Sequence, residues 1–166
     1  MEINQQISKV LNDTFDLTIK MVLSLSEEQL NTIPKDQGWT VGQIAEHILI
    51  CSSGIPDNKT EEINRAFDDL VPAINQIFLD FNSKYEADKS LLPRQDHYNK
   101  EELVLKLKDC KTNLLIDIKD KDLMLLCKDM DFPQLGFLTR YEWLSFIAVH
   151  VQRHNHQMEE NIKELD

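Results

Sequence analysis

Residues 139–158 read TRYEWLSFIAVHVQRHNHQM and decide the fold, because they describe one long helix with a single buried face. The stretch opens with Thr139 and Glu142 in the spacing of a capping box, in which the two side chains bind free backbone N–H groups. At about 100° per residue, several of its apolar residues and two of its histidines fall within one arc of the helix. The residues on this arc, with Leu165 from beyond the quoted stretch, are Trp143, Ile147, His150, His154, Met158 and Leu165. We therefore expect a core helix that carries His150 and His154 inward.

The rest of the 166-residue chain has the same helical character. Glycine occurs four times and proline five times, and no run alternates β-branched with polar residues, so we expect an all-α chain. Apolar residues recur at three- and four-residue spacing in four further stretches, each of which predicts a helix. These helices span about 4–25, 40–52, 60–83 and 99–118. In one domain, over residues 1–166, four or five such helices favour a helical bundle with long connections and room for one short extra helix.

Two segments of the chain have less regular patterns. Pro72 lies inside the helix predicted over 60–83, and proline usually kinks a helix, so we expect a bend or break near Leu70. Residues 120–137 form a long connection in which we expect one helical turn at 123–127.

The composition limits the class of protein. Eighteen Lys and Arg against 29 Asp and Glu give a net charge of −11, which argues against nucleic acid as a partner because phosphates attract clustered basic residues. No apolar run approaches the roughly 20 residues that cross a bilayer, and the first six residues do not form a signal peptide. We therefore expect a cytoplasmic protein with no membrane partner. Cys51, Cys110 and Cys127 form no C-x-x-C pair, which indicates reduced, mostly structural cysteines.

The histidines are the candidates for chemistry. His150 and His154 form an H-x-x-x-H pair, which places two imidazoles one turn apart on one helix face, as two ligands of one metal require. Two ligands alone hold a metal weakly, and the alternative is that they are hydrogen-bonded core histidines. His47 lies on the apolar face of the second helix, so packing that helix against the last one would join three nitrogens and leave one coordination position open. We expect His97 in a loop and His156 on the surface.

Two blocks of sequence resemble one known family. Residues 39–48 read WTVGQIAEHI, similar to the family's tryptophan, short spacer and histidine at the opening of the second helix. The other block runs from PQLGFLTR at 133–140 through EWL at 142–144 to HVQRHNHQ at 150–157. It is similar to the family's Pro-x-x-Gly loop and closing H-x-x-R-H-x-x-Q helix. In the order of these two blocks and in chain length, the sequence resembles the DinB/YfiT-like superfamily of metal-binding four-helix bundles.

The resemblance implies that His47, His150 and His154 bind a divalent metal, commonly nickel or zinc. It also implies a homodimer and, in an enzyme, either hydrolysis of a small-molecule substrate or transfer of a low-molecular-weight thiol. A divalent cation held by neutral imidazoles lowers the pKa of a water molecule or thiol toward neutrality, which suits both reactions. The competing hypothesis is a non-enzymatic bundle with structural histidines or a structural metal, because no general base is evident beside the ligands.

Five neighbours of the three histidines have their own expected roles. Gln43 and Gln157, each one turn from a candidate ligand, would orient imidazoles or else be ordinary surface amides. Arg153 is expected to form an ion pair with an acidic residue rather than to bind a substrate carboxylate. Cys51 is expected to be a small buried hydrophobic residue, with approach to the metal as the alternative. Glu46 diverges from His47 by about 100° around the helix, so we do not expect it to act as a base.

Overall fold

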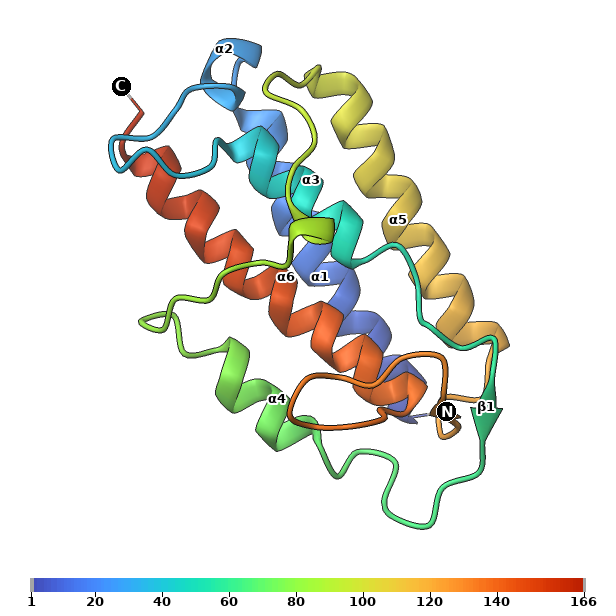
Figure 1. Cartoon of the computed structure of the whole chain (residues 1–166). Helices are drawn as coiled ribbons and strands as arrows, with labels where there is room; N and C mark the ends of the chain where they lie inside the picture. Colours follow the sequence, from blue (N-terminus) through green and yellow to red (C-terminus); the bar gives the residue numbers. More distant parts are fainter. Residues whose placement is uncertain (1, 166) are drawn as a thin grey trace.

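The computed structural model describes residues 2–165, and four long helices dominate it (Figure 1). They are α1 (Glu2–Ser24), α3 (Val41–Cys51), α5 (Lys100–Asp120) and α6 (Arg140–Lys163). Helix α1 packs along α5 and α6, and α3 lies against the same two helices. The predicted all-α four-helix bundle is therefore confirmed. The first and last residues of the predicted domain, Met1 and Asp166, lie outside the described part.

Short elements complete the described chain. They are α2 (Glu27–Leu30), β1 (Thr60–Glu61), α4 (Val71–Phe78), the 3-10 turn η1 (Lys89–Leu91) and β2 (Leu126–Cys127). Helix α4 packs on the outer side of α6, away from α1 (Figure 1). Among the helices of residues 2–165, none is both long enough and apolar enough to cross a bilayer.

The core lies between the long helices. Its largest side chains come from positions three or four residues apart, because that spacing forms one face of a helix. They include Leu11, Phe15, Ile44, Ile48, Leu107, Leu114, Leu144 and Ile147, which have almost no exposed surface. Burying each of these side chains stabilises the fold by about 1.5–3 kcal/mol relative to exposure.

The N-terminal cap predicted at Thr139 is present, and the starts of α3 and α5 are capped as well. Thr40 and Gln43 form a capping box at the start of α3, and Thr139 and Glu142 form another at the start of α6. The Asn99 side chain accepts a hydrogen bond from a backbone N–H at the start of α5. Because caps act locally, sequence spacing alone located these helix starts within a residue.

The helix predicted over 60–83 is wrong in its first half. Thr60 pairs with Cys127 in a two-stranded antiparallel sheet, and residues 62–70 follow an irregular path. Only α4 is helical, and Pro72 lies in its first turn, where a missing N–H costs nothing. The break therefore falls near Leu70, as Pro72 predicts, but it starts a helix instead of bending one.

The helical turn predicted at 123–127 is also wrong, because Leu126 and Cys127 form strand β2. The Cys127 N–H donates to the Leu138 carbonyl, so this segment is held by partners far along the chain. The local sequence of this segment therefore gives no indication of those partners. The apolar spacing at Leu123 and Cys127 reflects burial of both side chains under the bundle end, without a helix.

Candidate metal centre

Three histidines meet where α3 crosses α6. His47 comes from α3, and His150 and His154 come from successive turns of α6. The Nε2 atom of His150 lies 3.3 Å from Nε2 of His47 and 3.1 Å from Nε2 of His154. His47 and His150 are buried, with 3% and 8% of their surface exposed. The structure thus brings together the three histidines that the sequence singles out.

Hydrogen bonds fix which nitrogens face the centre of this group. His47 Nδ1 lies 2.7 Å from the Leu91 carbonyl oxygen, and His154 Nδ1 lies 2.9 Å from Oε1 of Gln157. Both partners are acceptors, so each Nδ1 carries the proton and donates it. The Nε2 atoms of His47 and His154 therefore keep free lone pairs that point inward, as metal-ligating imidazoles do.

His150 has an incomplete set of partners. Its Nδ1 is buried without a hydrogen-bond partner among the described residues, and the rings of Phe78 and Phe146 pack against the imidazole. Its Nε2 faces two nitrogen lone pairs. The Nδ1 atom stays unsatisfied whatever occupies the centre of the group, whereas a cation at the centre would engage the Nε2 lone pairs of all three rings.

The donor spacing fits a metal ion. In a tetrahedral site with nitrogens about 2.0–2.1 Å from the ion, neighbouring nitrogens are about 3.3–3.4 Å apart. The observed separations of 3.3 and 3.1 Å are close to that value. Imidazole nitrogens suit zinc, nickel and copper, so the donor type agrees with the spacing.

The electrostatics favour neutral imidazoles. Burial is the main cause that lowers the pKa of all three rings, and the pKa of His154 falls from 6.5 to about 4. Mutual repulsion adds to burial for His150, whose pKa lies well below 6.5. At neutral pH the three histidines are therefore deprotonated, which is the state that binds a metal.

Cys51 adds a sulfur atom to the group. Its Sγ lies 3.7 Å from Nε2 and 3.8 Å from Nδ1 of His47. Ligand atoms of His47, Cys51 and His150 all lie within 4.8 Å of one another. Burial raises the pKa of the Cys51 thiol to about 12, so the thiol is protonated when no cation is near.

Of the two glutamines, only Gln157 contacts an imidazole. The Gln43 side chain instead accepts from the Thr40 N–H and donates to the Gln95 carbonyl, so it serves the cap of α3. A capping position three residues after a threonine explains this outcome, since the backbone N–H is the nearest donor. His97 lies in an exposed loop as expected.

One prediction about an α6 side chain is wrong, and another holds in part. Among residues 2–165 Arg153 makes no ion pair, and it donates instead to the carbonyl oxygens of Phe78, Asp80 and Ser83. His156 is only half-exposed, because its ring stacks on Phe81 with the centroids 4.6 Å apart. Both side chains contact the end of α4 or the chain that follows it.

That chain, residues 79–91, forms a strap across the histidine group. Arg153 binds its beginning, and the Leu91 carbonyl at its end accepts from His47. In Figure 1 this segment passes in front of α6 and reaches α3. The strap thus joins α4 to the two helices that supply the histidines.

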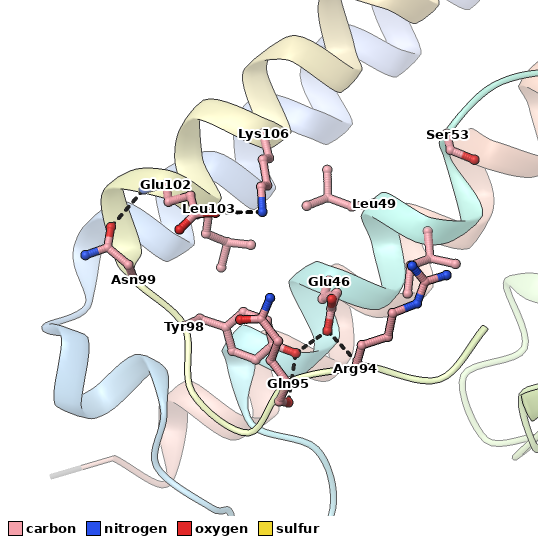
Figure 2. A pocket seen from close by; sticks show the side chains of 11 residues that line it. Glu46, Leu49, Ser53, Arg94, Gln95, Tyr98, Asn99, Glu102, Leu103 and Lys106 are labelled. Atoms are coloured by element: carbon pink, nitrogen blue, oxygen red, sulfur yellow. Dashed lines mark hydrogen bonds and ion pairs between the residues drawn. The ribbon is translucent and has the colours of Figure 1, made fainter. Parts of the chain in front are cut away.

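Glu46 faces a different part of the molecule. Its carboxylate accepts hydrogen bonds from the Arg94 backbone N–H, at 2.7 Å, and from the Tyr98 hydroxyl. These residues line a groove of about 310 Å³ between α3 and α5, with Lys106 on its far side (Figure 2). Glu46 therefore agrees with its expected direction and takes no part in the histidine group.

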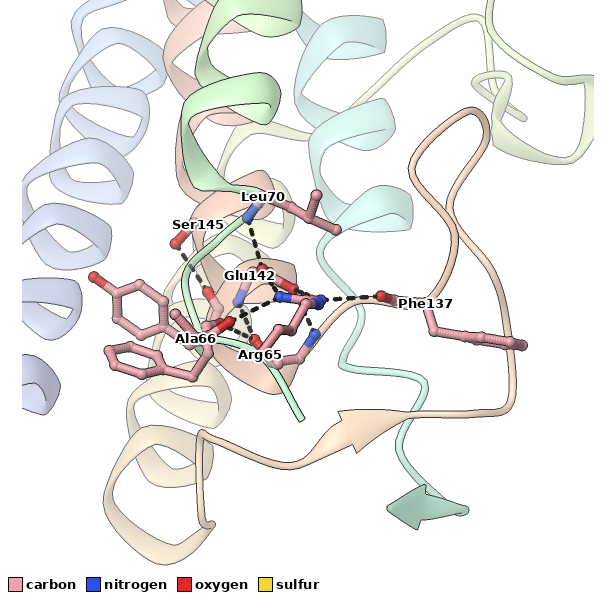
Figure 3. Close-up of polar contacts among 9 residues, drawn as sticks. Arg65, Ala66, Leu70, Phe137, Glu142 and Ser145 are labelled. Atoms are coloured by element: carbon pink, nitrogen blue, oxygen red, sulfur yellow. Dashed lines mark hydrogen bonds and ion pairs between the residues drawn. The ribbon is translucent and has the colours of Figure 1, made fainter. Parts of the chain in front are cut away.

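Sequence reasoning missed one buried ion pair. Glu142, fully buried, accepts from the Arg65 guanidinium at 2.7 and 2.8 Å and from the Leu70 and Thr139 N–H groups (Figure 3). The capping box signalled the Thr139 contact alone. Arg65 lies 77 residues away in sequence, so no local signal could find it.

Residues 11–158 match the sequence profile of the DinB superfamily. The chain belongs to this superfamily. It is 25% identical over 144 residues to the uncharacterized protein YuaE of Bacillus subtilis (strain 168), which covers 84% of this chain and 86% of that protein. No solved structure shows significant similarity to the chain. The DinB assignment confirms the resemblance in the two sequence blocks around the histidines.

Proposed function

We propose that this DinB-superfamily protein binds one divalent metal ion through Nε2 of His47, His150 and His154. The observation that carries the proposal is the convergence of the three Nε2 atoms, with two neighbouring separations of 3.3 and 3.1 Å. The Leu91 carbonyl and the Gln157 amide hold two of the rings in the metal-binding tautomer. Nickel and zinc are the metals that the family resemblance favours.

We propose further that the centre acts on a small molecule, by hydrolysis or by transfer of a low-molecular-weight thiol. A bound divalent cation supplies Lewis acidity, which lowers the pKa of a water molecule or thiol that it contacts. The chain supplies the remaining features. Phe78 and Phe146 pack against His150 and keep water from that side, while Gln157 holds the proton on Nδ1 of His154.

A non-enzymatic metal site is the second candidate function. The observation that favours it is the direction of Glu46, whose carboxylate is engaged by Arg94 and Tyr98 and is therefore not free to act as a base. A metal that only joins α3 to α6 would still stabilise the fold, because ligands that bind the native state alone shift unfolding.

Metal analysis tests the proposal directly. After loading with zinc or nickel and removal of free metal, we expect about one equivalent per chain, given the affinity of three imidazoles. His154→Ala should bind the metal at least about tenfold more weakly, and His97→Ala, at an exposed loop position, should bind it like the wild type. Less than about 0.1 equivalent in the wild-type protein would refute the metal site.

Activity and stability then separate the two candidate functions. If a folded His154→Ala protein loses an activity that the wild type has, the metal is catalytic. If the same variant only loses thermal stability, and no substrate is found, the metal is structural. The family resemblance also supports a homodimer, which light scattering of the purified protein would test. Cell fractionation would test the cytoplasmic location expected from the sequence.

A further inference from the structure

Cys51 lies on the same face of α3 as His47, one turn later. Residues four apart on a helix share a face, so both side chains reach the same point. The Cys51 sulfur is 3.7 Å from Nε2 of His47. Among residues 2–165 it falls within the 4.8 Å group that includes His150 but not His154. In residues 2–165 its hydrogen bonds are with the His47 ring alone.

We propose that Cys51 is a fourth protein ligand, whose sulfur binds the metal held by the three histidines. This inference rests on the metal binding proposed above. Its geometric basis is the spacing of the donors. Tetrahedral zinc with Zn–N of about 2.0–2.1 Å and Zn–S of about 2.3 Å places nitrogen and sulfur about 3.6 Å apart. The observed 3.7 Å between Cys51 Sγ and His47 Nε2 is close to that separation. Because Sγ also lies 3.8 Å from Nδ1, it must swing about the Cys51 Cα–Cβ bond toward the Nε2 lone pair when it binds the metal.

The other cysteines lack this environment. Cys110 is half-buried like Cys51, but its thiol donates to the Ser52 carbonyl at 3.3 Å. Cys127 is fully buried in β2, away from the histidines. Position, rather than burial or residue type, therefore distinguishes Cys51, and Cys110 provides a matched control.

Ligation by Cys51 involves no redox step. The sulfur lone pair forms the bond to the cation, and the S–H proton passes to solvent. Metal affinity then rises with pH, because the incoming ion competes with that proton. With three nitrogens and one thiolate, the resting site is four-coordinate, and its softer donor set favours zinc over harder ions such as magnesium or manganese.

The consequence for a substrate is specific. A substrate thiol or water must displace the Cys51 sulfur or enter as an additional ligand, whereas a site with histidines alone would leave a position free. Cys51 therefore makes the centre selective for ligands that compete with a thiolate.

Cobalt(II) titration of the full-length protein, kept reduced and free of oxygen, tests this inference. Tetrahedral cobalt gives visible d–d bands whatever its ligands, and a cobalt–thiolate bond adds a near-ultraviolet charge-transfer band. We expect both signals from the wild type and from Cys110→Ala. Cys51→Ala should keep the visible bands and lose the charge-transfer band.

Zinc affinity provides a second readout. Loss of an outer hydrogen-bond partner alone weakens metal sites by about 10–100-fold, so loss of a direct ligand in Cys51→Ala should cost at least about tenfold. Cys51→Ser, which conserves volume, controls for repacking of α3. Far-ultraviolet circular dichroism of each variant checks that the helices are intact.

The outcomes distinguish the two proposals. Visible cobalt bands without charge transfer in the wild type, or a charge-transfer band that survives in Cys51→Ala, would overturn ligation by Cys51 and leave the histidine site standing. A wild-type protein with no cobalt bands and no bound zinc would instead overturn the metal site itself, and with it the role of Cys51.

Discussion

The hydrogen bond from His154 to Gln157 shows how one side chain prepares a ligand. Gln157→Leu removes the acceptor for Nδ1 and leaves the ring free to rotate or to change tautomer. We expect zinc affinity to fall by about 10–100-fold with little change in helix content. Competition against a fluorescent zinc chelator measures this effect. Gln152→Leu, at another half-buried position of α6, is the control and should bind zinc like the wild type.

The Arg65–Glu142 pair makes a prediction about stability. Arg65→Met leaves a fully buried carboxylate with backbone donors alone, and breaking a buried pair on one side costs about 3 kcal/mol. Urea unfolding of the metal-free protein measures that loss. Lys9→Met removes an exposed pair with Asp13 and should cost less than about 1 kcal/mol. Equal losses in the two variants would show that burial of Glu142 does not set the energy.

At the scale of elements, the strap over residues 79–91 depends on Arg153. Its guanidinium binds carbonyl oxygens at the end of α4 and the beginning of the strap, so Arg153→Met removes several anchors at once. We expect faster backbone hydrogen exchange in the strap and unchanged exchange in α1 and α5. Arg94→Met, an exposed arginine beyond the strap, should leave the exchange unchanged.

Individual elements also show what sequence reasoning reaches. Helix starts at Thr40 and Thr139 were predictable because a capping box is complete within four residues. The irregular path before α4 was not predictable, because Phe67 packs on Tyr141 and Arg65 binds Glu142, both distant in sequence. Apolar residues there follow a helical spacing, but long-range contacts determine the backbone.

In the candidate site, too, some features were predictable from the sequence and others were not. The three histidines were predictable from helix periodicity and family resemblance. The prediction depended on a single tertiary feature, the packing of α3 against α6. The partners supplied by the strap were not, because a loop without regular structure gives no sign of where its carbonyl oxygens point. Local spacing therefore finds the ligands, and tertiary structure decides what holds them.

For the whole molecule, the buried histidines predict a pH dependence of stability. In the unfolded chain His154 has a pKa near 6.5, and in the fold burial lowers it to about 4. Between these values the unfolded state binds more protons, so the free energy of unfolding of the metal-free protein falls as pH drops from 6.5 toward 4. Above pH 6.5 this contribution is absent.

Comparison of variants isolates that effect from other acid-sensitive groups. His154 alone should account for about 2 kcal/mol of the stability lost between pH 7 and pH 5. Urea unfolding of His154→Gln should therefore show a shallower loss over this range than the wild type. His97→Gln, at an exposed position, should follow the wild type. A parallel decline in all three proteins would contradict a neutral His154 ring in the folded protein.

The contact between His47 and Leu91 has a consequence for how this protein can vary. The acceptor is a main-chain oxygen, so any residue at position 91 can supply it and point substitutions there are nearly silent. An insertion or deletion in residues 79–91 would shift that oxygen and release the His47 ring. The orientation of this imidazole is thus encoded by the length of a connection, and relatives can diverge there in composition while keeping the same number of residues.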